Sequence, residues 1–182
     1  MRIQELTLLH VRDGRTWSEL TVSDLGREEG ARALRIEPDR TWLAAVTKTG
    51  ERAHLSDCEW DLSEHTWVGD QLTYLLYPDR YCALGYVSSP DGRGVPRFYL
   101  NGQLPFWISG GAVCTLDLEV DAVADAEFAR AAWKDLDRFK KAVVGGAIDL
   151  VTARNTIRDV HWGIRMLRSS TLRQRLVELS MA

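Results

Sequence analysis

The sequence has little of what marks a secreted or membrane-inserted protein. Its 182 residues include three cysteines, Cys58, Cys82 and Cys114, with no C-x-x-C pair. This odd, widely spaced set argues against a disulfide scaffold or a thiolate zinc site, and it predicts free thiols in a reducing compartment. Residues 1–5 lack the apolar run of a signal peptide, and no stretch is apolar enough to span a bilayer. We therefore expect a cytoplasmic protein with no membrane partner.

Several familiar chemistries are also missing. The formal net charge is −3 and no basic block or patch stands out, which argues against a general nucleic-acid binder. The sequence has neither a Walker phosphate loop nor a G-x-S-x-G nucleophile elbow. The four histidines (His10, His54, His65 and His161) are scattered and form no H-E-x-x-H motif, so a histidine metal site is not expected. A small anionic substrate would need local positive charge or a bound metal.

The length suits a single domain over residues 1–182, and the pattern divides into a strand-rich part and a helical end. Strands are predicted at 6–11, 15–22, 41–48, 72–77, 81–87, 97–100 and 113–123. Residues 23–40 look like a loop with little fixed structure, and 88–96 like a long turn. Many short strands with regular turns predict a barrel or a sandwich.

The helical end begins near Trp133. Apolar residues recur at helical spacing (Trp133, Leu136, Phe139 and Val143; Ile157, Val160, Ile164 and Leu167; Leu172, Leu176 and Leu179). Gly145 and Gly146 end the first of these segments. Residues 125–132 are ambiguous, because their alanines favour a helix and a turn followed by a short strand is equally compatible. We predict an α+β fold, with a predominantly antiparallel, barrel-like β core and C-terminal helices packed against it.

The clearest chemical feature is an acidic strand face. In an extended strand, Asp117, Glu119 and Asp121 lie on one face, whereas Leu118 and Val120 lie on the other. Three carboxylates so close together repel one another unless something positive lies between them. Oxygen ligands suit a hard divalent cation, so the pattern predicts a metal site, although a solvated acidic face remains the alternative.

Further polar residues are ambiguous when taken alone. Asp135 could complete a metal shell and Lys134 could hold a phosphate, although acids also favour any helix start. Asn101 could ligate a cation, but Asn before Gly is also a common turn. Arg15 could stabilise charge on a phosphate or could be an ordinary surface arginine. Most of the seven tryptophans are expected in the core, and Trp67 is a candidate for stacking on a base.

The order of four sequence motifs points to a known family. R-x-W-S-E (from Arg15) is followed by Y-x-N-x-x-x-P-F (from Tyr99), D-L-E-V-D (from Asp117) and W-K-D-L-D-x-F (from Trp133). This order resembles the FomD-like family of metal-dependent nucleotide phosphohydrolases. That family includes nucleoside di- and triphosphate phosphatases and the hydrolase of a cytidylylated phosphonate in fosfomycin biosynthesis. The resemblance covers residues 97–139 well and residues 15–19 more thinly.

The resemblance implies a β-barrel-like core flanked by helices, Mg²⁺ or Mn²⁺ as cofactor and a nucleotide as substrate. The metal ligands that it implies are Asn101, Asp117, Glu119, Asp121 and Asp135. Tyr99 of the second motif and the candidate stacking residue Trp67 are our expected substrate side chains, and Lys134, beside the acidic motif, would contact a phosphate. Arg15 matches the proposed proton-donor arginine of the family. Because arginine hardly deprotonates, we assign Arg15 to charge stabilisation.

Two departures bear on the substrate and the number of metal ions. The middle acid is Glu119 where some members have Asp, and Arg138 stands where some carry an acid. The resemblance also favours a hairpin at 125–132. The expected activity is metal-dependent hydrolysis of a phosphoanhydride bond in a nucleoside di- or triphosphate or a nucleotide-linked small molecule. The alternatives are an RNA-binding accessory domain without turnover and a cation site that only stabilises the fold. The oligomeric state is not predicted.

Overall fold

The computed structural model describes residues 3–89, 94–128 and 130–182. Within these residues it has twelve strands and three helices. They are β1 (Gln4–Arg12), β2 (Arg15–Glu28), β3 (Ala31–Ile36), β4 (Thr41–Val46), β5 (Asp61–Thr66), β6 (Gln71–Leu76), β7 (Cys82–Ser88), β8 (Arg97–Gln103), β9 (Trp107–Ser109), β10 (Ala112–Thr115), β11 (Asp117–Asp125), β12 (Ala131–Lys134), α1 (Leu136–Val144), α2 (Leu150–Met166) and α3 (Ser170–Met181). The predicted α+β class, with strands first and helices last, is confirmed.

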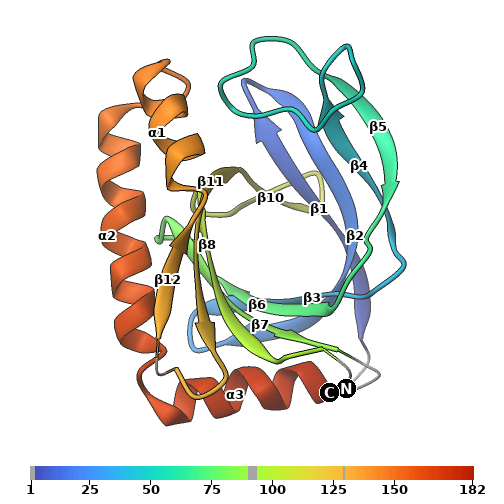
Figure 1. The fold of residues 1–182 in the computed structure, drawn as a ribbon. Coiled ribbons are helices and arrows are strands. Elements are labelled where there is room, and N and C mark those ends of the chain that lie inside the picture. Colours follow the sequence, from blue (N-terminus) through green and yellow to red (C-terminus); the bar gives the residue numbers. More distant parts are fainter. Residues whose placement is uncertain (1–2, 90–93, 129) are drawn as a thin grey trace.

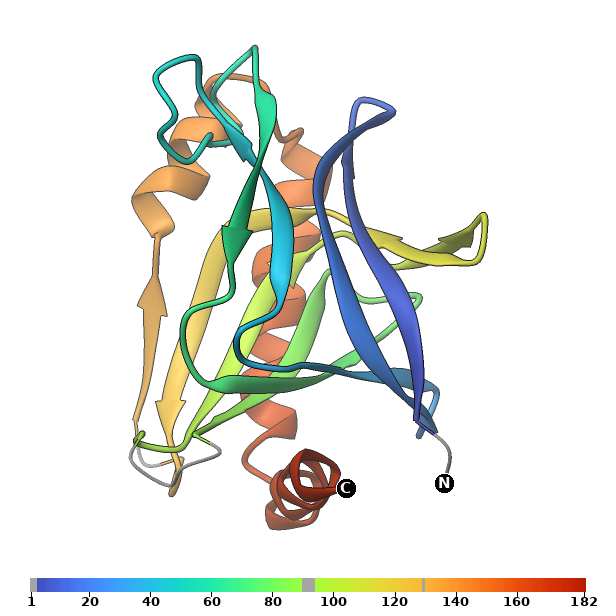
Figure 2. The same cartoon turned by 90° about the vertical axis from the view of Figure 1, so that its right-hand side faces the viewer.

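All twelve strands belong to one strongly curved sheet (Figures 1 and 2). Its order is β12-β11-β8-β7-β6-β3-β2-β1-β10-β9, with β4 paired to β2, and β5 to β4. Every pair is antiparallel except β1 with β10, which is parallel. Among the described residues, β12 at one end makes no pair with β9 at the other. The sheet is therefore not closed into the predicted barrel.

The chain itself joins the two ends of this sheet. β10 and β11 are separated by Leu116 alone, yet β10 pairs with β1 and β11 pairs with β8. The predicted strand 113–123 is thus two strands that change partner at Leu116. The sheet can curl round without a closing ladder because this continuous segment spans the gap. The acidic motif begins where the segment changes partner.

The predicted loop at 23–40 is wrong. β2 continues to Glu28, and β3 follows after the turn at Gly30, which has φ 84°. The register of β2 and β3 shifts between Asp24 and Gly26, and Gly26 has φ 94°, so the glycine serves a β-bulge within a strand. Asp24 also pairs with Arg32 across the two strands at 2.7 Å. The polar residues and glycines that suggested a loop here belong to a bulged hairpin.

The ambiguous segment at 125–132 is a hairpin. β11 ends at Asp125, and β12 pairs back on it over Ala131–Lys134. Trp133 therefore lies in a strand, and its apparent helical spacing with Leu136 is a coincidence of two elements. The middle of the predicted turn at 88–96, residues 90–93, lies outside the described residues.

The helices cover the outer face of one part of the sheet (Figure 1). α2 packs on β7 and β8, α1 packs on β11, and α3 lies across β6 and β7. One apolar cluster, with Leu84, Leu100 and Val160, fills this layer. A second, with Leu20, Leu34 and Tyr74, lies among β1, β2, β3 and β6. None of the described helices is long and apolar enough to cross a membrane.

Candidate active site

The acidic face of β11 is formed by an irregular strand. Asp117 pairs with Gln103, but the next β11 residue paired to β8 is Val120, opposite Gly102. Two residues are thus inserted, and Glu119 takes the left-handed conformation with φ 59°. Because the insertion is even in number, Asp117 and Asp121 still lie on the side of Gln103 and Asn101. Strand alternation alone predicted the shared face without this bulge.

Glu119 is fastened at several points. Its N–H donates to Asp117 Oδ1 at 2.7 Å, and its Oε1 lies 2.8 Å from His54 Nδ1. His54 belongs to the connection between β4 and β5, so this contact ties a distant loop to the bulge. The second oxygen, Glu119 Oε2, is buried and has no hydrogen-bond partner among the described residues.

Asp121 is a buried carboxyl group close to the charge of Asp117. Its side chain accepts a hydrogen bond from Tyr99, and Oδ1 has no partner within the described part of the chain. Burial, followed by the nearby charge of Asp117, raises the pKa of Asp121 to about 7. Burial also raises the pKa of Tyr99, and the charges of Asp121 and Asp117 add to that shift. Such a group is costly to ionise unless a positive charge lies nearby.

A cavity of about 220 Å³ opens beside these carboxylates. The residues that line it are Leu8, His10, Trp17, Ser18, Leu20, Ile36, Trp42, Ala44, Ala45, Arg52, Ala53, Trp67, Leu72, Tyr74, Ala83, Gly85, Tyr99, Asn101, Gln103, Asp117 and Glu119. Aromatic and aliphatic side chains dominate this lining, with a smaller polar set from β1, β8, β11 and the β4–β5 connection. That mixture is typical of small-molecule sites.

Five residues predicted from the sequence line this cavity: Trp67, Tyr99, Asn101, Asp117 and Glu119. Asn101 donates from Nδ2 to Gln103 Oε1 at 3.0 Å, which fixes the orientation of its amide. The Trp67 ring stands at 73° to the Trp42 ring with centroids 6.2 Å apart, and its Nε1 donates to the Asp70 carbonyl. Asp121 is not a lining residue, but it is hydrogen-bonded to Tyr99, which is.

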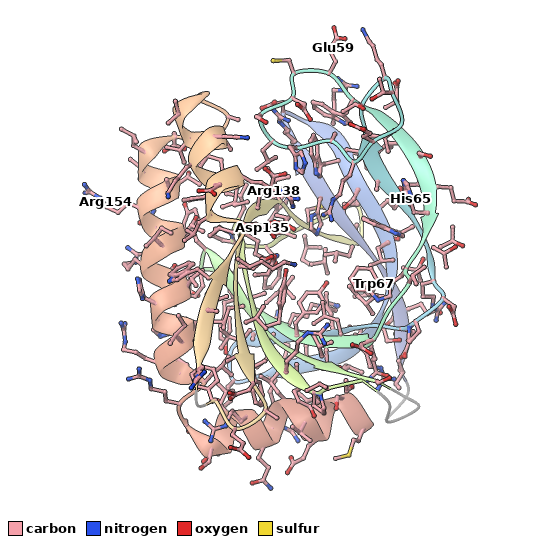
Figure 3. The ribbon with its side chains drawn as sticks, viewed as in Figure 1. Glu59, His65, Trp67, Asp135, Arg138 and Arg154 are labelled. Atoms are coloured by element: carbon pink, nitrogen blue, oxygen red, sulfur yellow. The ribbon has the colours of Figure 1, made fainter. Side chains whose placement is uncertain are left out.

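Lys134 and Asp135 lie beside the site. Lys134 is directly opposite Asp121 in the β11–β12 pair, but its side chain is 61% exposed. Asp135 precedes α1 with φ 59°, and its carboxylate lies 3.2 Å from Arg138 and 3.8 Å from Lys134. Figure 3 shows Asp135 and Arg138 together where β12 meets α1, across the curved sheet from Trp67. Arg138 stands where some members of the FomD-like family carry an acid, and here it also forms an ion pair with Asp135.

Arg15 lies outside the cavity lining. Its guanidinium stacks 4.3 Å from the centre of the Trp60 ring, and Nη2 donates to the Trp60 carbonyl at 3.4 Å. The predicted contact of Arg15 with a phosphate stays a prediction.

Sequence reasoning did not indicate His10, Ser18, Arg52 or Gln103, which all line the cavity. Burial lowers the pKa of His10, and its Nδ1 accepts the Asp117 N–H at 3.3 Å, so His10 is held as a neutral acceptor. His10 reaches the site through the parallel β1–β10 pair, and Arg52 reaches it through the long β4–β5 connection. Neither contact leaves a local sequence signal.

The donor chemistry fits a hard divalent cation. The candidate ligands Asn101, Asp117, Glu119, Asp121 and Asp135 offer only oxygen for coordination, and two of their buried oxygens are unpaired. Across residues 3–89, 94–128 and 130–182, however, no group of three or more His, Cys, Asp or Glu is spaced to hold an ion. The five-residue shell is not assembled in this arrangement, so the metal set stays a prediction.

The fold recurs in proteins that bind nucleotides. The phosphatase SC4828, solved with the non-hydrolyzable nucleotide GPCP, matches with a TM-score of 0.78 at 17% identity, over 91% of this chain and 81% of that chain. FomD, solved with CDP, matches with a TM-score of 0.71 at 18% identity, over 89% of this chain and 82% of that chain. This chain has the FomD-like fold. The resemblance predicted from the four motifs is thereby confirmed for the fold. No family model and no curated protein matches the sequence.

Proposed function

We propose that this chain hydrolyses a phosphoanhydride bond in a nucleoside di- or triphosphate, or in a nucleotide-linked small molecule, with Mg²⁺ or Mn²⁺. The observation that carries the proposal is the pair of buried, unpaired oxygens, Glu119 Oε2 and Asp121 Oδ1, on a strand whose acids border an aromatic cavity. Unpaired buried carboxylate oxygens are costly and call for a positive partner. The two nucleotide-binding proteins of the same fold support a nucleotide as the substrate.

Asn101, Asp117 and Asp121 are the central ligands in this proposal, since Asn101 and Asp121 are directly opposite in the β8–β11 pair. Glu119 and Asp135 would complete the shell after small side-chain rotations, because His54 and Arg138 now hold one oxygen of each. A bound ion would neutralise charge on the phosphates and would polarise the bond to be broken.

Other residues would bind the base and the phosphates of the substrate. The cavity is smaller than the roughly 300–1,000 Å³ of typical ligand sites, so it suits a base with part of the sugar. Trp67 and Tyr99 would contact the base, and the phosphates would extend toward the acidic end. Asp117, whose Oδ1 is held by the Glu119 N–H, has a second oxygen to accept the proton of the attacking water. Lys134 would meet a phosphate from the rim.

The test is product release from a substrate panel. Purified protein is given nucleoside di- and triphosphates of each base and a cytidylylated phosphonate ester, with Mn²⁺, Mg²⁺ or chelator. Asp117→Asn is compared with Asp125→Asn at the exposed end of the same strand. We expect metal-dependent release of phosphate or nucleoside monophosphate that Asp117→Asn loses and Asp125→Asn keeps. Equal rates in chelator, or an active Asp117→Asn, would contradict the proposal.

A further inference from the structure

Arg52 is a cation of the cavity that sequence motifs did not indicate. Among the described residues that line the cavity, it is the only lysine or arginine. It shares this lining with Asp117, Glu119 and Gln103, beside which the proposed substrate would place its phosphates. We infer that Arg52 binds the substrate phosphates and that Arg15 is a positioning residue for the connection that carries Arg52. This inference rests on the proposed function.

The backbone of Arg52 is rigidly mounted. Arg52 forms an isolated antiparallel bridge with Val46 at the end of β4. The next N–H, of Ala53, donates to the Ala45 carbonyl at 2.9 Å, and Thr47 N–H donates to the Glu51 carbonyl at 2.8 Å. The side chain therefore leaves a fixed point, although Arg52 belongs to a connection and is itself exposed.

The guanidinium of Arg52 is uncommitted. Within the described part of the chain it makes no ion pair and no side-chain hydrogen bond, whereas the arginines nearest the site are engaged: Arg12 with the Asp57 carbonyl, Arg15 with Trp60 and Arg138 with Asp135. Its positive charge nevertheless reaches the site, because it adds to burial in lowering the pKa of His10 and offsets part of the rise that burial causes in the pKa of Tyr99. A guanidinium with all of its donors free can take two phosphate oxygens at once.

The contacts of Arg15 point to a different task. The Trp60 Nε1 donates to the Thr16 carbonyl at 3.1 Å, and Trp17 packs edge-on against Trp60 at 5.0 Å. Arg15 covers the same Trp60 ring, so it fastens the far end of the β4–β5 connection to the β1–β2 hairpin. His54 fastens the middle of that connection to Glu119. Loss of Arg15 would loosen the mount of Arg52 without removing a phosphate contact.

The experiment measures binding and turnover in matched variants. Arg52→Gln, Arg52→Lys, Arg15→Gln and the exposed control Arg27→Gln are titrated by calorimetry with CDP, a methylene-bridged guanosine nucleotide and inorganic pyrophosphate, in Mg²⁺ and in chelator. Thermal unfolding is recorded for each variant. We expect Arg52→Gln to weaken pyrophosphate and nucleotide binding by roughly 10- to 100-fold, with an unchanged melting temperature. Arg52→Lys should recover part of the affinity, because it keeps the charge and loses the fork.

Arg15→Gln should instead lower the melting temperature and should weaken pyrophosphate binding far less than Arg52→Gln. Wild-type affinity in Arg52→Gln, or a wild type that binds no pyrophosphate or nucleotide, would overturn the inference. So would a loss of affinity in Arg15→Gln equal to that in Arg52→Gln with no loss of thermal stability. Binding that depends on Arg52 without any turnover would refute the proposed hydrolysis alone, whereas turnover that ignores Arg52 would refute this inference alone.

Discussion

The acidic residues of β11 show how much a strand pattern can and cannot reveal. Alternation predicted that Asp117 and Asp121 share a face, and they do so only because the inserted bulge has an even number of residues. One inserted residue would have turned Asp121 into the opposite layer. The left-handed conformation of Glu119 belongs to a bulge that strand alternation does not predict, and its bond to His54 joins residues 65 positions apart.

Asp121→Asn should stabilise the metal-free protein while it destroys activity. The change removes a buried charge that faces Asp117 and keeps an oxygen to accept the Tyr99 hydroxyl. We expect a gain of about 1–3 kcal/mol in unfolding free energy, measured by denaturant titration in chelator. Asp125→Asn, at the exposed end of β11, is the matched control. A destabilised Asp121→Asn in chelator would mean that the carboxylate is already compensated.

His54→Ala should impair the site through Glu119. Without the imidazole, Oε1 loses its partner and neither oxygen of this largely buried carboxylate has one among the described residues, at a cost of about 1–3 kcal/mol. His54→Gln can still donate a hydrogen bond and should recover part of the loss. The measurements are urea unfolding and the Mn²⁺ dissociation constant for each variant. Unchanged Mn²⁺ affinity in His54→Ala would show that Glu119 needs no support from the β4–β5 connection.

Among the elements, β8 and β11 meet closely at Gly102, which lies opposite Val120 beside the bulge. A Cβ on Gly102 would lie 2.6 Å from the Val120 carbonyl oxygen and 2.9 Å from Thr156 Cγ2 of α2. Gly102 thus lets both the neighbouring strand β11 and the helix α2 approach β8 closely. The bulge and the helix layer depend on the same missing side chain.

Gly102→Ala should therefore damage both stability and the site. We expect a loss of about 1–3 kcal/mol in unfolding free energy, because the Val120 backbone must move. The moved strand carries Glu119 and Asp121, so Mn²⁺ affinity should fall as well. Gly163→Ala is the comparison, since its Cβ would meet the Leu100 and Leu84 side chains under α2. It should destabilise the fold and spare Mn²⁺ binding; equal Mn²⁺ losses in both variants would contradict a local effect at the bulge.

The helices were predictable because apolar residues recur at helical spacing in each of them, and α2 also has a clear start. Asp149, for example, accepts from the Val151 and Thr152 N–H groups at the start of α2. The strands were harder to predict. β5 carries mostly exposed residues (DLSEHT) and was missed, since its only described partner is β4. The end of β2 after Val22 and all of β3 were predicted as loop, because a bulge and a tight turn bring glycines and acids into these strands.

At the scale of the whole molecule, composition hides how charge is distributed. The net charge of −3 suggested no basic patch, yet α2 exposes Arg154, Arg158 and Arg165 along its outer face. Figure 3 shows Arg154 pointing away from the sheet. The incomplete closure of the sheet could not be predicted either, because it depends on β10 pairing with β1 while β11 pairs with β8.

A charged pair joins the C-terminal helix α3 to strand β2. Arg175 of α3 makes two 2.8 Å hydrogen bonds to the Glu28 carboxylate at the end of β2. The hydrogen bond from Arg175 holds the pKa of Glu28 below its ordinary value of 4.5. The stabilisation from this pair is therefore full above that value, and it is lost as the pH falls through the lowered pKa.

Glu28→Gln should lower the melting temperature by about 2–4 °C at pH 7, a modest effect because Arg175 is partly exposed. The difference from wild type should shrink as the pH falls below 4.5 and should vanish once Glu28 is protonated. Scanning calorimetry from pH 3 to pH 7 measures it, with the exposed Glu64→Gln as control. A difference that stays constant across this range would rule out the ion pair as its source.

The central claim is that the acids of β11 serve a metal-dependent hydrolysis of nucleotides. The most direct measurement is the initial rate of phosphate release from a nucleoside diphosphate by chelator-stripped protein as Mn²⁺ is added back. The account predicts no release without Mn²⁺, a saturable rise with it, and no rise in Asp117→Asn under the same conditions. A rate independent of Mn²⁺, or one that survives in Asp117→Asn, would contradict it.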